Sequence, residues 1–287
     1  MQKRSEYKRY TRSRASNIIY FTFLILMGLF SILPFFYSIV TSLKPLDELL
    51  VFPPKFWVER PTLSNYALLP SLINKLEVPL SRYAFNSVFT TCVSTILHII
   101  VATAAAFAFS KSKIKCRNVI FWIVQLSLLY NAYTLAVPQY LVFSKLRLID
   151  TFWIYILPAI PSSVGVFLMK QYMESSIPDA LLEAARIDGA GAFQMFFKIV
   201  VPITKPAWMT LLLLSFQSQW SYTPGGTIFS EELKNLPYVL SSISAGGIAR
   251  AGSTMAATVI MMLPPIIVYF ISQSNVMETM STAGMKG

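Results

Sequence analysis

Charged side chains gather in one short stretch of a chain that is otherwise mostly apolar: Asp179, Glu183, Arg186, Asp188 and Lys198. Their carboxylates and cations could bind opposite charges on another surface. An enzyme site needs a nucleophile, a base and an orienting group together, and the sequence has a single histidine, His98, with no acid in its apolar run. No phosphate loop of the Gly-x4-Gly-Lys-Ser/Thr kind occurs. We therefore predict a docking surface and no enzyme active site.

The stretch from Ile177 to Pro202 is predicted to form a helix, a glycine turn and a second helix. Ser176 is a suitable cap, Pro178 fits a first helical turn, and Gly189 suits a left-handed helix end, so we expect the first helix at residues 178–188. One face of this helix carries mostly small side chains, which would admit close approach of another surface: Ala180, Leu181, Ala184, Ala185 and Ile187.

Two acidic residues of this helix, Asp179 and Glu183, lie one turn apart. Like charges at this spacing destabilise an isolated helix, so at least one of them is expected to bind a partner on another chain. The alternative is an amphipathic helix that lies on lipid. Its acidic character disfavours that alternative, because the cytoplasmic leaflet is anionic.

The overall composition indicates an integral membrane protein, with 55% hydrophobic residues, 13% charged residues and a mean hydropathy of +0.57 over 287 residues. The net charge of +11 comes from basic residues in short segments between apolar runs. There they set topology and meet lipid head groups, so no nucleic-acid partner is predicted. Cys92 and Cys116 occupy different environments, which predicts neither a disulfide framework nor a metal site.

Six runs lack Asp, Glu, Lys and Arg, and each is near or above the roughly 20 residues that cross a bilayer. The predicted fold is therefore all-α, with six transmembrane helices and one polar hairpin. The fourth and fifth runs are the shortest and are expected to borrow flanking residues. The runs are Ile18–Leu43, Tyr83–Ser110, Val119–Phe143, Phe152–Met169, Pro206–Tyr222 and Ala251–Met277.

The distribution of Lys and Arg predicts the orientation. With the N-terminus inside, the cytoplasmic segments carry 15 basic residues and the outer segments carry 9. Both termini and the hairpin are then cytoplasmic. We expect a basic segment at residues 1–16, a membrane domain at 17–277 and a tail at 278–287. Outer loops follow at 44–82, 144–151 and 223–250, and a cytoplasmic loop at 170–205.

The energy source is expected to lie outside the predicted spans. Transporters that use an ion gradient usually carry an ionisable group at mid-membrane, and the only candidate here is His98. A packed polar residue is the alternative to a proton relay for that histidine. A cytoplasmic partner acting on the hairpin would supply the drive instead.

Aromatic and amide side chains of the third and fifth runs could contact a sugar, which offers apolar faces and many hydrogen-bonding groups. The alternative is that the aromatic rings belong to the interfacial belt and the amides bridge helices. The candidates are Gln125, Tyr130, Asn131, Tyr133, Gln217, Gln219, Trp220 and Tyr222.

The hairpin carries Glu183-Ala184-Ala185, then Gly189, Ile199 and Val201-Pro202, with Val in place of the usual Leu before Pro202. This spacing resembles the EAA motif of membrane permeases of binding-protein-dependent ABC importers. The resemblance implies a coupling helix that docks on a cytoplasmic ATPase dimer, which would hold ATP and Mg; this chain needs no cofactor. The residues implied in coupling are Glu183, Ala184, Ala185, Asp188, Gly189 and Pro202.

Further segments resemble the maltose-type (MalG-like) permeases of carbohydrate transport: Asn86-Ser87, Met255-Ala256-Ala257 and the tail from Thr282 to Gly287. The resemblance implies a bacterial cell membrane, a MalF-like second permease and an extracytoplasmic substrate-binding protein. It also implies that Gly284, Lys286 and Gly287 contact the ATPase. The family's Trp-Asn-acid-Phe appears here as Trp220-Ser221-Tyr222-Thr223, which leaves contacts of that loop open.

Oligosaccharide import is the function that this resemblance implies. Two alternatives stay open: the same machine for a peptide, a polyamine or a glycerol phosphate compound, and a membrane scaffold that transports nothing.

Overall fold

The computed structural model describes residues 14–73, 78–112, 115–130 and 132–284. Every regular element in these ranges is a helix, as the apolar runs predicted. The α-helices are α1 (Arg14–Ser42), α2 (Leu46–Leu49), α3 (Ser64–Ile73), α4 (Leu80–Lys111), α5 (Arg117–Leu126), α6 (Ala132–Lys145), α7 (Trp153–Ile156), α8 (Ser163–Ser176), α9 (Asp179–Ile187), α10 (Ala192–Met195), α11 (Val201–Ile203), α12 (Lys205–Trp220), α13 (Leu236–Ser244) and α14 (Ala251–Gly284).

Three described helices are long and apolar enough to cross a membrane: α1, α4 and α14. Three bent pairs bring the number of candidate spans to as many as six, if each pair counts as one span. The pairs are 117–129 with 134–145, 153–159 with 163–176, and 192–203 with 205–220. The prediction of a six-span helical membrane protein agrees with this arrangement.

The third predicted span is not one continuous helix. Its two halves, α5 and α6, meet at 112°. A 3₁₀ turn at Ser127–Leu129 ends the first half, where the Ser127 hydroxyl donates to the Val124 carbonyl at 2.6 Å. Such side-chain to main-chain bonds compete with the helical ladder, and hydropathy alone does not report them.

The fourth span bends by 40° between α7 and α8. Pro158 and Pro161 lie at this bend, where each lacks an amide N–H and crowds the preceding turn. Ser162 then caps α8, since its hydroxyl accepts the Gly165 amide at 3.1 Å.

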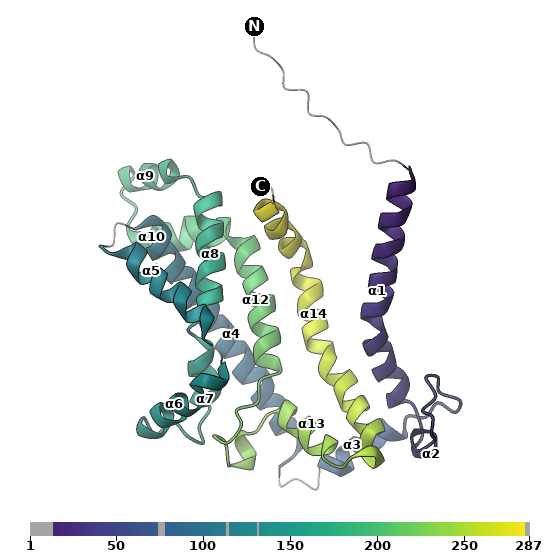
Figure 1. Cartoon of the computed structure of the whole chain (residues 1–287). Coiled ribbons are helices and arrows are strands. Elements are labelled where there is room, and N and C mark those ends of the chain that lie inside the picture. The colour runs from purple at the N-terminus through teal and green to yellow at the C-terminus, as the bar shows by residue number, and fades with distance from the viewer. Residues whose placement is uncertain (1–13, 74–77, 113–114, 131, 285–287) are drawn as a thin grey trace.

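The helices have two distinct ends in Figure 1. The hairpin end carries α9, the start of α1 and the C-terminal end of α14. The loop end carries α2, α3 and α13. Between the two ends, α12 lies between α8 and α14, and α1 packs against the far side of α14. No residue in the most apolar stretch of α1 is buried within the protein, so most of this helix is free to contact lipid or another chain.

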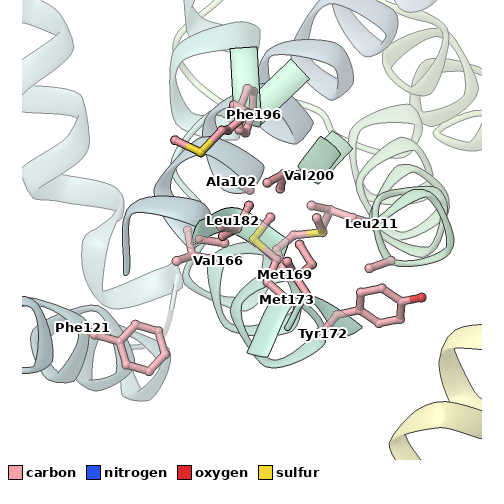
Figure 2. Packing of buried hydrophobic residues seen from close by; sticks show 14 residues of the cluster. Ala102, Phe121, Val166, Met169, Tyr172, Met173, Leu182, Phe196, Val200 and Leu211 are labelled. Atoms are coloured by element: carbon pink, nitrogen blue, oxygen red, sulfur yellow. The ribbon is translucent and has the colours of Figure 1, made fainter. Parts of the chain in front are cut away.

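The larger core cluster joins the hairpin to the membrane helices (Figure 2). Met169 and Met173 of α8 are fully buried, and they pack with Leu182 of α9 and Leu211 of α12. A smaller cluster at the loop end joins α3, α4, α13 and α14 around Tyr83. Each end of the molecule therefore has its own packed core.

Candidate functional site

The hairpin helix α9 is seated by one buried side chain. Leu182 is 2% exposed and belongs to the larger core cluster, where its burial contributes about 2 kcal/mol. The predicted cap is wrong: Ser176 is the last residue of α8, and Pro178 occupies the N-cap position without a side-chain bond. Helix α8 extends past Met169, as expected for a short run that borrows flanking residues, and this extension packs Tyr172 and Met173 into the core.

A buried lysine holds the start of α9. Lys111, the last residue of α4, has a side chain that is 6% exposed. Its ammonium group donates to the Ile177 carbonyl at 2.6 Å and lies 2.7 Å from a carboxylate oxygen of Asp179. The hydrogen bond and charge of Lys111 hold the pKa of Asp179 below its ordinary value. Of the two acids on α9, Asp179 thus has its partner within this chain.

The end of α9 follows the predicted glycine turn. Gly189 has φ +83°, a conformation that suits glycine because it lacks a Cβ. The Ala190 amide donates to the Ala185 carbonyl at 2.9 Å, and the Gly189 amide donates to the Arg186 carbonyl at 3.0 Å. These two bonds form a Schellman motif, with Asp188 at the C-cap. Ala185 and Ala190 pack against the core cluster and fix the turn.

The outer face of the hairpin is acidic and apolar. Glu183 and Ala184 are exposed, and Glu183 forms no ion pair with any residue in the described ranges. Ile187, one turn after Glu183 on α9, is 87% exposed, and Phe193, in α10 after the glycine turn, is 83% exposed. Large apolar side chains around a free carboxylate suit a partner with an apolar cleft and a basic group. This surface, formed by Glu183, Ala184, Ile187 and Phe193, is called the docking face below.

The second arm of the hairpin is distorted just before Pro202. Residues Phe196–Val200 form a π-helical turn, and Pro202, which is exposed, follows in α11. A proline cannot donate to the carbonyl four residues earlier, and a wider turn relieves the crowding. The chain then bends by 78° into α12, and the Trp208 indole of α12 donates to the Val201 carbonyl of α11 at 3.1 Å across this bend.

The polar candidates of the fifth span lie along different cavities. Gln217 and Trp220 line a cavity of 440 Å³ between α1, α12 and α14. Trp220 is 5% exposed, and its indole donates to the Met261 carbonyl at 2.9 Å. Trp220 therefore bridges α12 and α14, a role that the alternative had given to the amides and not to the aromatic rings.

Gln219 lines a second cavity, of 390 Å³, between α4, α8 and α12. His98, Ser162 and Ser215 contribute further polar groups to its wall. Nδ1 of His98 donates to the Ala159 carbonyl at 3.0 Å, next to the helix break, as expected for a packed polar residue. A neighbouring cavity of 620 Å³ contains Tyr222 and shares Pro158 and Pro161 with the second.

The candidates of the third span lie near its break. Gln125 is half-buried in α5, and Tyr130 is 65% exposed at the turn. Tyr133 lies in α6, and its side chain is not among those that the structure describes. Asn131, Lys286 and Gly287 lie outside the described residues, and Gly284 ends α14.

The loop end carries a polar cluster that the sequence alone did not assign. Asn86 of α4 is fully buried and donates to the carbonyls of Glu232 at 2.8 Å and Lys234 at 2.7 Å. Ser87 accepts the Leu236 amide at 2.8 Å, and Tyr83 donates to Glu231 at 2.7 Å. The Asn86-Ser87 pair at the start of an apolar run was the signal available in the sequence. Lys111, at the other end of that run, had been counted only among the basic residues that predict the orientation in the membrane.

Comparison with known proteins identifies relatives along most of the chain. Residues 7–281 match the sequence profile of a family described as binding-protein-dependent transport system inner membrane component. The chain is 28% identical over 269 residues to the arabinooligosaccharides transport system permease protein AraQ of Bacillus subtilis (strain 168), covering 92% of this chain and 94% of the relative.

Two further relatives agree with this match. The chain is 30% identical over 267 residues to the sulfoquinovosyl glycerol transport system permease protein SmoH of Agrobacterium fabrum (strain C58 / ATCC 33970), covering 92% of this chain and 91% of SmoH. A chain in the crystal structure of a bacterial ABC transporter involved in the import of the acidic polysaccharide alginate is 26% identical, with a TM-score of 0.75. That likeness covers 92% of this chain and 98% of the other.

Proposed function

Since the chain belongs to the binding-protein-dependent transport system inner membrane component family, and is thus a multi-pass permease subunit of an ABC transporter, we propose that it imports a sugar or oligosaccharide. It forms half of the translocation pathway, and a second permease forms the other half. The names of its relatives support a carbohydrate: arabinooligosaccharides for one and sulfoquinovosyl glycerol for another. An extracytoplasmic binding protein delivers the cargo at the loop end.

The docking face carries this proposal. Leu182 and Lys111 seat α9 firmly, whereas Glu183, Ile187 and Phe193 stay exposed. A helix that is rigidly attached on one side and apolar on the other can pass motion to a partner. The partner is a cytoplasmic ATPase dimer that holds ATP and Mg, so the hairpin end faces the cytoplasm. The Lys and Arg distribution supports the same orientation.

The cargo path follows the two cavities that share Pro158 and Pro161. Gln219 lies 14 residues after Lys205, about 21 Å along α12, and His98 lies 13 residues before Lys111, about 20 Å along α4. The polar groups of this wall therefore lie at similar depth, in the outer half of the bilayer. Amides and hydroxyls facing lipid there would be costly, which favours a wall that faces a water-filled path.

The test uses the complex of this chain with its second permease, ATPase subunits and cognate binding protein in proteoliposomes. Ligand screening of the binding protein should find a sugar or oligosaccharide, and that ligand should be taken up at the expense of ATP. Glu183→Lys should abolish the stimulation of ATP hydrolysis by the binding protein while the subunits still co-purify, because it reverses the charge of the docking face. A peptide, polyamine or glycerol phosphate ligand would replace the sugar proposal, and normal stimulation in Glu183→Lys would remove the coupling role.

A further inference from the structure

One helix touches the polar clusters at both ends of the molecule. Helix α4 is 32 residues long and contains neither proline nor glycine. It therefore spans about 48 Å without a break. The other long helices contain proline, Pro34 in α1 and Pro264 and Pro265 in α14, and the remaining candidate spans are bent by 40° to 112°. Among the described spans, α4 is the stiffest connection between the two ends.

At the loop end α4 holds the segment 231–236. Asn86 donates to two carbonyls of this segment, at 2.8 and 2.7 Å, and the residue is 0% exposed. Ser87 accepts the Leu236 amide from the same segment. Because a buried amide group that loses its partners is costly, the segment and the start of α4 must move together.

At the hairpin end α4 holds the start of the coupling helix. Lys111 binds the Ile177 carbonyl and the Asp179 carboxylate, and its side chain is 6% exposed. Ile177 is itself 1% exposed and belongs to the core cluster. The linker between α8 and α9 is thus fixed to α4 as well as to α8.

We propose that α4 is a strut that carries movement from the segment 231–236 to α9, and that Lys111 is the positioning residue that attaches α9 to it. This inference rests on the proposed function, because it needs a signal outside the membrane and an ATPase inside. Binding-protein contact at the loop end displaces the segment 231–236, Asn86 transfers that displacement to α4, and Lys111 transfers it to α9. The bent spans can absorb motion by changing their bend angles, whereas the unbroken helix α4 cannot.

The test measures ATP hydrolysis by the reconstituted complex with and without the purified cognate binding protein. The stimulation ratio is the rate with the binding protein divided by the rate without it. Lys111→Met removes both bonds to α9 and should reduce the stimulation ratio most. Asp179→Ala removes one bond and should reduce it less. Lys111→Arg can still donate to both acceptors and should restore most of the stimulation, which a loss of folding would not permit. Glu174→Ala is the matched control, because it breaks a Lys170 ion pair of the same 2.7 Å length that stays within α8.

Coupling through one strut also predicts non-additive effects. Asn86→Ala should reduce the stimulation ratio, and Asn86→Ala combined with Lys111→Met should be no worse than Lys111→Met alone, since the two residues act in series. Wild-type stimulation in Lys111→Met, with stimulation lost in Glu183→Lys, would overturn the strut and leave the proposed function standing. Stimulation that survives in Glu183→Lys as well would overturn the coupling role that the proposed function gives to the docking face.

Discussion

The indole Nε1–H of Trp220 donates to the carbonyl of Met261 at 2.9 Å, across the contact between α12 and α14. Within α14 the Met261 carbonyl would normally accept the amide of residue 265, but Pro265 has no N–H. The proline that interrupts α14 thus creates an acceptor, and a tryptophan from the neighbouring helix satisfies it. Neighbouring helices commonly supply such partners inside membranes.

Replacing Trp220 by Phe should lower the stability of the protein by about 1 kcal/mol, because the carbonyl loses its donor while the ring stays. The stacking on Phe216, with ring centroids 5.7 Å apart, should survive. Thermal unfolding of the purified complex would measure the change. Trp153→Phe is the control, since that side chain is 52% exposed. Equal stability of both variants would show that the Met261 carbonyl finds another donor.

Replacing Gly189 by Ala should strain the turn after α9 by about 1 to 2 kcal/mol. The cost comes from φ +83° alone, because nothing lies within 4 Å of the added Cβ. Hydrogen exchange should quicken at residues 185–190, and stimulation of ATP hydrolysis should fall. Gly191→Ala is a matched control with equal space and φ −72°, and it should change neither measurement. Similar exchange in the two variants would contradict the role given to the left-handed turn.

Replacing Gln219 by Ala should raise the cargo concentration needed for half-maximal uptake about threefold to tenfold, the effect of one lost hydrogen bond. Initial uptake rates in proteoliposomes would measure this. Gln273→Ala, at an exposed position of α14, should leave uptake unchanged. A larger effect of Gln217→Ala than of Gln219→Ala would move the path to the cavity beside α1.

The effect of Asp179→Ala on coupling should be independent of pH across the neutral range. Lys111 lowers the pKa of Asp179 in the folded protein, so the stabilising ion pair is complete above the ordinary aspartate pKa of about 3.9. It is lost only as the pH falls through the lowered folded value. The ratio of stimulated hydrolysis between wild type and variant, measured from about pH 8 to about pH 5.5, should stay constant. A ratio that approaches one within this range would contradict the pairing.

The sequence by itself determined the helical membrane class, the long spans and the glycine turn of the hairpin. These features depend on hydropathy over about 20 neighbouring residues and on the backbone preferences of single glycines and prolines. The Glu183 to Pro202 spacing also identified the family. Such features can be predicted from short stretches of sequence, because they do not depend on which helices pack together.

Only the tertiary structure decided which polar groups meet. Asp179 pairs with Lys111, 68 positions away in the sequence, and Asn86 binds carbonyls more than 140 positions away. Trp220 donates to the Met261 carbonyl, which lacks its helical donor because residue 265 is proline. It also decided the break of the third span, the length of α8 and the division of Gln217, Gln219 and Tyr222 among separate cavities. Hydrogen bonds and cavities of this kind depend on how helices cross, and residues that are distant in sequence set those crossings through packing.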